Sequence, residues 1–484
     1  MFKSSAIALS IALLLFPVAS QSTDIGKLDL PEMGDSSGSL LTIAEERELG
    51  EEFFRYLHTE LTISEDPEVQ EYIQTIGSKL TVNSDDSGYP FRFFVVMDNE
   101  INAFAGPGGY IGVNSGLILL SEQESELASV MAHEIAHVTQ RHLYRGVEAQ
   151  QRLSIPTLAA TVAAIALGTK NPQMGQAALA AIQAGNVQFQ IDFTREHEKE
   201  ADRVGMETLS RSDYDPRSMP TFFERLQQST RYVGNKVPEF LRTHPVTESR
   251  ISDTRGRAEN YPYKQYPDSL AYQLIKAKLR VMTDTNTANV IKFFQGHLNQ
   301  GTEEQRTVAL YGMGLVAIQT QKYREAEMIF QDLVKKYPNQ PQYQTALAKT
   351  ALEARQYDVA LKRYQGLVTR FPNKEAMKIE YAEVLLKAGQ PKNAREVLLN
   401  LNERTKKQPI FNRLSAQVYG NLGQPAESHR YLAEYYYNMG HTKEAIQQVR
   451  LAKTSRGLTP QLNAILNERL QFFLMKEKEE REKQ

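Results

Sequence analysis

The order of apolar and polar residues predicts a mixed N-terminal part followed by a long helical remainder. Residues 42–61 carry apolar side chains at helical spacing, namely Ile43, Leu49, Phe53, Leu57 and Leu61. Residues 91–97 and 109–113 instead alternate aromatic and β-branched side chains, which predicts two strands. The glycine-rich stretch at 106–109 predicts a turn between them, and the pattern is then helical to about residue 260. The expected fold class is mostly α with a small sheet.

The C-terminal half contains a sequence repeat. Residues 322–339 (KYREAEMIFQDLVKKYPN) match residues 356–373 (QYDVALKRYQGLVTRFPN) position by position. Equivalent residues are 34 apart: Ala326 and Ala360, Phe330 and Tyr364, Pro338 and Pro372, with Ala394 continuing the series. This period and this order of small, aromatic and proline positions resemble the tetratricopeptide repeat, in which helix pairs stack into a solenoid. We therefore expect an all-α tetratricopeptide solenoid over 266–484, with a surface suited to peptides or proteins.

Composition narrows the function classes. The 484 residues have a net charge of −2 with both signs mixed, so neither nucleic acid binding nor a generally basic membrane-binding surface is indicated. The chain has no cysteine. Disulfides, thiolate metal ligands, a cysteine nucleophile and a lipidated cysteine are therefore excluded.

The first 20 residues are typical of a secretory signal peptide. Lys3 precedes an apolar run over 6–16, and small residues follow before Gln21. The run is shorter than the roughly 20 residues that span a bilayer, and no later segment reaches that length. We expect residues 1–20 to be removed on export and residues 21–40 to form a flexible polar arm. A retained membrane anchor is the alternative.

The helix expected over 121–144, with Ser121 as its N-cap, carries a His-Glu-x-x-His sequence. Four residues advance a helix by about 400°, so His133 and His137 lie on one face and can reach the same metal ion. Glu134 is offset by about 100°, where its carboxylate can take a proton from a water molecule acidified by zinc. A surface helix can carry this pattern without a metal, so a third ligand has to be found.

A second helix, expected over 193–209, offers that ligand. Glu198 and Asp202 lie one turn apart on it. Glu198 can supply a carboxylate oxygen, and Asp202 can hold a ligating histidine through its second ring nitrogen. The alternative is a solvated face, because charged residues are dense here. His142 is five residues beyond His137, a rotation of about 140°, so we expect it to face elsewhere as a solvated or supporting residue.

The stretch NAFAGPGGYIGVNSGL, the His-Glu-x-x-His helix and the Glu-x-x-x-Asp helix, in this order, resemble the HtpX/CAAX-prenyl-protease-like metallopeptidases over roughly residues 40–260. The resemblance implies a zincin-type α+β metallopeptidase domain over 41–262 with one zinc ion per chain. It implies the following roles: zinc ligands His133, His137 and Glu198; general base Glu134; supporting residue Asp202. Glu200 competes with Glu198 but does not begin a Glu-x-x-x-Asp match. Membrane-embedded members have spanning helices, which are absent here.

Peptide substrates of zincins typically add a strand to an exposed sheet edge. The candidates for that edge are Asn102, Ala103, Phe104, Gly109 and Tyr110. An ordinary hairpin in the core is an equally open alternative.

Two further stretches invite an interpretation. His244 precedes a proline, which places it outside a helix, and soluble bacterial members of the family have a similar Thr-His-Pro sequence. We hypothesise that His244 reaches the zinc as a fourth ligand that blocks water, or stabilises the oxyanion; a surface loop is the alternative.

Residues 155–185 are apolar and alanine-rich. We expect them to pack or to cover the site, with peripheral membrane contact as another interpretation.

A signal peptide, a zincin domain and a tetratricopeptide solenoid together resemble the periplasmic β-barrel assembly-enhancing proteases of Gram-negative bacteria. The resemblance implies a periplasmic zinc endopeptidase with chaperone-like activity, which assists assembly of outer-membrane β-barrel proteins and degrades misfolded or stalled ones. It also implies that the solenoid docks on the β-barrel assembly machinery and its clients. The alternative is a chaperone or scaffold with a latent metal site. A prenyl-protein protease fits poorly with export.

Overall fold

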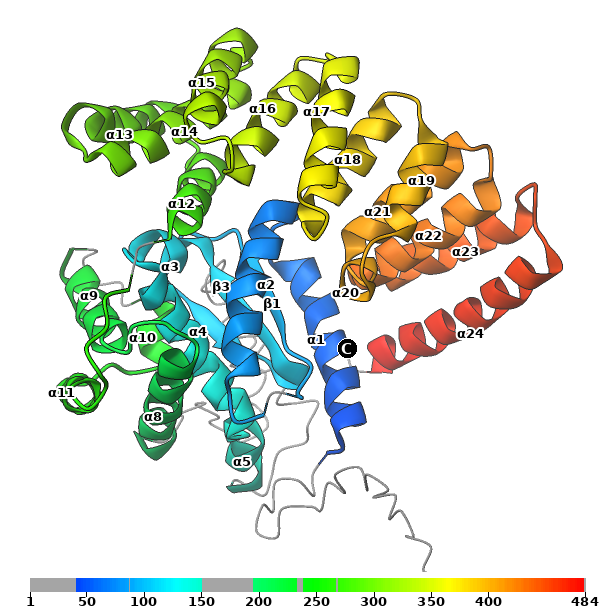
Figure 1. Ribbon diagram of the computed structural model, residues 1–484. Helices are drawn as coiled ribbons and strands as arrows, with labels where there is room; N and C mark the ends of the chain where they lie inside the picture. The colour runs from blue at the N-terminus through cyan, green and yellow to red at the C-terminus, as the bar shows by residue number, and fades with distance from the viewer. Residues whose placement is uncertain (1–40, 87, 150–194, 233–237, 267–268, 483–484) are drawn as a thin grey trace, which may run out of the picture.

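The computed structural model describes residues 41–86, 88–149, 195–232, 238–266 and 269–482. The expected signal peptide, the polar arm and residues 155–185 therefore lie outside the described residues. Figure 1 shows a lower part built around a small sheet and an arc of helices that curves over it. Among the described helices, none combines the length and the apolar character that crossing a membrane requires.

Two N-terminal helices lead into the sheet. The helix α1 (Ile43–Glu60) begins at Thr42, which forms a reciprocal capping box with Glu45. The helix α2 (Pro67–Val82) begins at Asp66, whose carboxylate accepts two backbone N–H groups, with proline at the first helical position. The helix predicted over 42–61 is thus confirmed.

The sheet has three strands in the order β1-β3-β2. β1 (Arg92–Val96) runs parallel to β3 (Tyr110–Asn114), and β2 (Ala103–Ala105) runs antiparallel to β3. The two predicted strands are confirmed to within one residue. The predicted turn is the 3₁₀ turn η2 (Pro107–Gly109), where Gly108 and Gly109 have φ angles of 68° and 75° that favour glycine.

The strand order corrects part of the expected substrate edge. β3 is the central strand, since it pairs with β1 on one side and with β2 on the other. Tyr110 begins this central strand and Gly109 lies in η2 outside the strands, so neither residue lies at a free edge of the sheet. Asn102, Ala103 and Phe104 lie in or next to β2, which is an edge strand of the described sheet.

Helices complete the lower part and correct a second expectation. They are α3 (Ser115–Leu120), α4 (Glu124–Thr139), α5 (His142–Ala149), α8 (Arg195–Arg211), α9 (Ser218–Tyr232), α10 (Glu239–Thr243) and α11 (Glu248–Ala258). A single helix over 121–144 is wrong at both ends. Ser121 ends α3, with its hydroxyl donating to carbonyls of that helix, and Gln123 is the N-cap of α4. At the other end Arg141, with a φ of 54°, separates α4 from α5.

The C-terminal part is the predicted solenoid. Its helices are α12 (Leu270–Thr283), α13 (Thr287–Gln300), α14 (Glu303–Gln319), α15 (Tyr323–Lys336), α16 (Pro341–Glu353), α17 (Tyr357–Arg370), α18 (Glu375–Lys387), α19 (Pro391–Leu399), α20 (Glu403–Lys406), α21 (Pro409–Asn421), α22 (Pro425–Asn438), α23 (Thr442–Thr454) and α24 (Pro460–Glu482). The repeated alanines Ala326, Ala360 and Ala394 are fully buried, as are Phe330 and Tyr364. The period therefore marks the positions at which neighbouring helices touch.

The solenoid contacts the lower part near both of its ends. On α12, Lys278 is buried and its ammonium lies 2.8 Å from the Asp66 carboxylate and 2.6 Å from that of Glu68. On α24, the Lys476 ammonium lies 2.8 Å from Glu48 and 2.9 Å from Glu52 of α1. The C-terminal helix α24 thus attaches the arc to α1.

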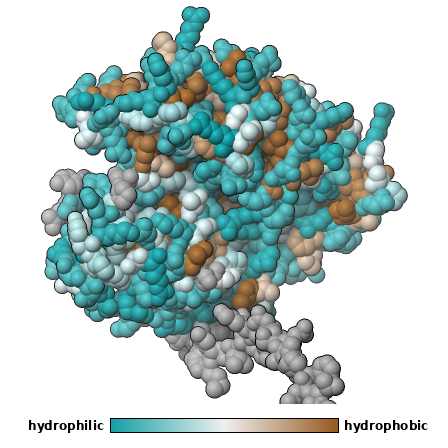
Figure 2. All heavy atoms as spheres, viewed as in Figure 1, coloured by the Kyte–Doolittle hydropathy of each residue, from teal (hydrophilic) through white to brown (hydrophobic). Residues whose placement is uncertain are grey.

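The same face viewed as spheres shows where the two parts differ (Figure 2). Apolar side chains gather over the solenoid helices, whereas mostly hydrophilic side chains cover the lower part.

The ion pairs at the two junctions, together with the packing of Tyr272 and Ile275 of α12 into the lower core, hold the arc in place.

Lys278→Met should destabilise the protein by about 3–5 kcal/mol, because it removes a buried cation that pairs with two largely buried carboxylates. Urea unfolding monitored by circular dichroism measures this loss. Lys336→Met removes an exposed lysine that pairs with Glu303 and is the matched control, for which the unfolding curve should stay in place. If both substitutions lowered the unfolding free energy equally, Lys278 would contribute no more to stability than an exposed lysine does.

Candidate metal centre

Close packing of α4 against α8 creates the site. Small residues line this contact: Ala136 of α4 packs against Ala201 and Val204 of α8. At Gly205 an added Cβ would lie only 3.2 Å from the backbone nitrogen of His133. A larger residue there would push the two helices apart, so glycine sets the distance between the two motif helices.

Four buried side chains converge where the helices meet. His133, His137, Glu198 and His244 each offer a donor atom, and these atoms lie within 4.8 Å of one another. The Nε2 atoms of His133 and His137 are 3.0 Å apart, and the Glu198 carboxylate oxygens lie 3.4 and 3.5 Å from them. The structure thus brings together the three residues that the motifs single out and adds His244.

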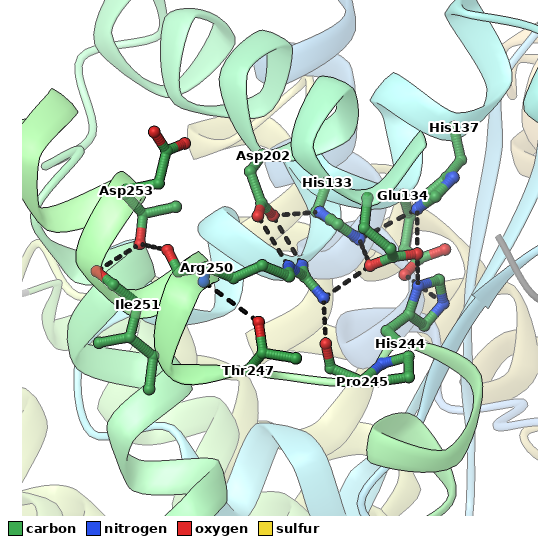
Figure 3. A network of polar contacts seen from close by, with 12 residues as sticks. His133, Glu134, His137, Asp202, His244, Pro245, Thr247, Arg250, Ile251 and Asp253 are labelled. Atoms are coloured by element: carbon green, nitrogen blue, oxygen red, sulfur yellow. Dashed lines mark hydrogen bonds and ion pairs between the residues drawn. The ribbon is translucent and has the colours of Figure 1, made fainter. Parts of the chain in front are cut away.

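His133 is held from behind by an acidic residue and an arginine (Figure 3). Its Nδ1 lies 3.0 Å from the Asp202 carboxylate. Arg250 of α11 donates to both oxygens of that carboxylate at 2.8 and 2.7 Å, and its Nη1 lies 2.7 Å from Glu198. Because Nδ1 faces a carboxylate, it carries a proton, which leaves Nε2 to serve as a metal donor.

His244 is not a surface loop residue. It ends α10, is buried, and its Nδ1 lies 2.9 Å from Glu198 while its Nε2 lies 3.5 Å from Glu134. Figure 3 shows the ring facing the two motif histidines. The Glu134 carboxylate also accepts the backbone N–H of Ala105 at the end of β2. The edge strand of the sheet therefore lies directly beside the expected catalytic base.

His142 lies against His137, contrary to the rotation argued from an unbroken helix. The chain turns at Arg141, and this turn brings the Nδ1 of His142 to 2.8 Å from the Nδ1 of His137. The Nε2 of His142 then faces the Glu200 carboxylate at 3.1 Å. Glu200 is thus not among the clustered donors. It contacts His142, which in turn contacts His137.

Burial shifts the proton affinities in the cluster. Burial raises the pKa of Glu134, against the opposing effect of His244 and His133. Burial, together with the charge of His133, holds the pKa of His137 well below its usual range. For His133 burial acts in the same direction, but hydrogen bonds to Asp202 and Glu198 outweigh it and raise the pKa to about 9.

The donor set fits a divalent transition metal. Imidazole nitrogens and a carboxylate oxygen are ligands that such ions prefer, and all four side chains are buried. Arg250 was missed by the sequence argument. No local pattern connects it to Glu198, since α11 is far away along the chain and reaches the site only through the tertiary fold.

The fold and the donor cluster define a metallopeptidase joined to a helical-repeat solenoid. The sequence profile of Peptidase family M48 matches residues 67–258, and two tetratricopeptide repeat profiles match 308–339 and 351–418. The β-barrel assembly-enhancing protease of Yersinia pestis is 38% identical over 339 residues, which are 69% of each chain. The chain belongs to the M48 metallopeptidases and, within them, to the family of β-barrel assembly-enhancing proteases.

Two further proteins and one solved structure are similar to parts of this chain. The β-barrel assembly-enhancing protease of Escherichia coli (strain K12) is 40% identical over 314 residues, 65% of this chain and 64% of that protein. The mitochondrial metalloendopeptidase OMA1 of Schizosaccharomyces pombe is 28% identical over 180 residues, 37% of this chain and 50% of that protein. The crystal structure of the tetratricopeptide protein YrrB covers 38% of this chain and 93% of that chain at 15% identity, with a TM-score of 0.29.

Arg250→Leu should cost about 3–5 kcal/mol of unfolding free energy in the metal-free protein, because two buried carboxylates then lose their cation. Urea unfolding in the presence of a chelator measures this. Arg255→Leu on the same helix removes an exposed arginine that pairs with Glu224, and should leave the unfolding curve unchanged. Equal stability of the Arg250 and Arg255 variants would contradict the structural role assigned to Arg250.

Proposed function

We propose that this protein is a periplasmic zinc-dependent endopeptidase with chaperone-like activity, which assists assembly of outer-membrane β-barrel proteins and degrades misfolded or stalled ones. The observation that carries the proposal is the convergence of His133, His137 and Glu198 with Glu134 beside them. The names of the relatives and the expected signal peptide support the substrates and the compartment.

In this proposal the two motif histidines and Glu198 would hold one zinc ion per chain, which would supply Lewis acidity when bound. Glu134 would act as the general base toward a water molecule that attacks the peptide carbonyl, and would return the proton to the leaving nitrogen. The raised pKa of Glu134 suits a group that has to accept and return a proton. Asp202 and Arg250 keep His133 in place throughout.

The edge of β2 is the proposed binding surface for the substrate backbone. Ala103 and Phe104 pair with β3 on one side, and the Ala105 N–H contacts the catalytic carboxylate. A peptide that adds a strand to the other side of β2 would run alongside Glu134. An unfolded or stalled chain offers such an extended segment, whereas a completed barrel does not.

The solenoid is the proposed docking element for the β-barrel assembly machinery and for client proteins. Tetratricopeptide helices present ridges and grooves that generally bind peptides or protein surfaces. The ion pairs of Lys278 and Lys476 fix the arc relative to the domain that contains the four clustered donors, so a client held on the arc would stay attached to that domain.

One observation favours a second function, that of a chaperone or scaffold with a latent site. The His244 ring occupies the position next to Glu134 and offers a fourth donor to the metal. A zinc ion with four protein donors resembles a structural site, since catalysis needs one open position. In this state the protein would bind clients without cutting them.

Glu134→Gln separates the two functions. Wild type and variant should both contain about one zinc ion per chain, because Glu134 is not a ligand. The variant should cleave an unfolded model protein at least about 100-fold more slowly, since it has lost its general base. Metal analysis and gel-based cleavage assays measure these quantities. Zinc in both proteins without cleavage by either would favour the latent chaperone.

His244→Ala should raise the cleavage rate of the unfolded model protein, because it removes the donor that competes with water and opens the space beside Glu134. Initial rates at equal zinc content measure the effect. His297→Ala on α13, far from the site along the chain, is the control. A loss of about 10²–10³ in rate would instead assign His244 to oxyanion stabilisation. An unchanged rate would remove both roles.

A further inference from the structure

The two motif histidines are supported in different ways. The Nδ1 of His133 faces the Asp202 carboxylate, which accepts two hydrogen bonds from Arg250. The Nδ1 of His137 faces another imidazole, that of His142, at 2.8 Å. A ligating histidine usually donates its second nitrogen to a carboxylate, a carbonyl or water, so an imidazole in this position calls for an explanation.

His142 is itself fixed from several sides. Its ring is buried, with an exposed fraction of 1%, and stacks on the ring of His197 at a centroid distance of 4.4 Å. Its Nε2 lies 3.1 Å from Oε2 of Glu200, and the same oxygen accepts from Nη1 of Arg145 at 2.9 Å. Three helices, α4, α5 and α8, thus contribute one chain of contacts that ends at His137.

The chemistry of this chain of contacts fixes its direction. A hydrogen bond between two Nδ1 atoms needs a proton on one and a lone pair on the other. For the Nε2 of His137 to donate its lone pair to a metal, its Nδ1 has to carry the proton. His142 then accepts through Nδ1 and carries its own proton on Nε2, which points at the Glu200 carboxylate. Each donor in the chain therefore meets an acceptor.

We propose that His142 and Glu200 are positioning residues that hold His137 in the tautomer and ring orientation required for metal binding. The inference rests on the proposed function only in taking His137 as a metal ligand. Neither residue touches the cluster of donor atoms, so both act through His137. Loss of either should weaken metal retention, by about 10–100-fold for a supporting group of this kind.

His142→Leu and His142→Asn form the first test. Leucine fills the buried space but cannot accept a hydrogen bond, whereas the Oδ1 of asparagine stands close to the place of the histidine Nδ1. We expect the dissociation constant for zinc, measured by competition with a chromophoric chelator, to rise about 10–100-fold for leucine. Asparagine should restore most of the affinity.

Glu200→Ala and its control form the second test. The alanine variant removes the acceptor for His142 and should also weaken zinc binding. Glu207→Ala removes a carboxylate from the same helix, where it forms an exposed pair with Arg211, and should leave the affinity unchanged. The visible spectrum of the cobalt-substituted proteins provides a readout of ligand geometry, and we expect it to change in His142→Leu and Glu200→Ala only.

The outcomes separate this inference from the proposed function. Wild-type affinity and an unchanged cobalt spectrum in His142→Leu or in Glu200→Ala would overturn the positioning role, while leaving the metal site intact. Weak binding in the leucine variant without recovery in the asparagine variant would also overturn it, since the accepting atom would then be irrelevant. Failure of the wild type itself to bind zinc would instead overturn the proposed function.

Discussion

The site depends most on the ion pairs that the guanidinium of Arg250 forms with Glu198 and Asp202. Glu198 and Asp202 lie one turn apart on α8 and are both buried, and two buried carboxylates side by side are costly unless a cation joins them. Arg250 contacts both. In doing so it attaches α11 to α8 and, through the short connection before α11, holds His244 beside the candidate metal ligands. One ion pair network thus fixes the position of Glu198, the support of His133 and the location of His244 next to Glu134.

The contacts between the solenoid and the lower part also pair carboxylates with cations. It carries cations into the junctions where the lower part presents carboxylates, through Lys278 at α2 and Lys476 at α1. The carboxylate of Glu71 on α2 also accepts the first backbone N–H groups of α18, so a helix of the lower part completes a helix end of the arc. In the proposed function, client binding and cleavage would therefore take place on surfaces with a fixed relative position.

Features that depend on neighbours close in the chain could be read from the sequence. The four-residue spacing of His133 and His137 places both rings on one helix face, and the spacing of Glu198 and Asp202 does the same on the next motif helix. The 34-residue repeat and the alternation in the two strands are also local patterns, and the structure has them where they were expected. Local periodicity encodes secondary structure because side-chain direction follows directly from backbone geometry.

Only the tertiary structure decided which distant residues contact those elements. An unbroken helix would have turned His142 away from His137, but the positive φ of Arg141 ends the helix and brings the two rings together. The strand order placed Tyr110 in the centre of the sheet and left β2 at the edge beside Glu134. Arg250 reaches Asp202 from 48 positions along the chain. The sequence by itself determined the ligand spacing and the repeat; packing between distant segments determined their support, since that depends on contacts that no local spacing records.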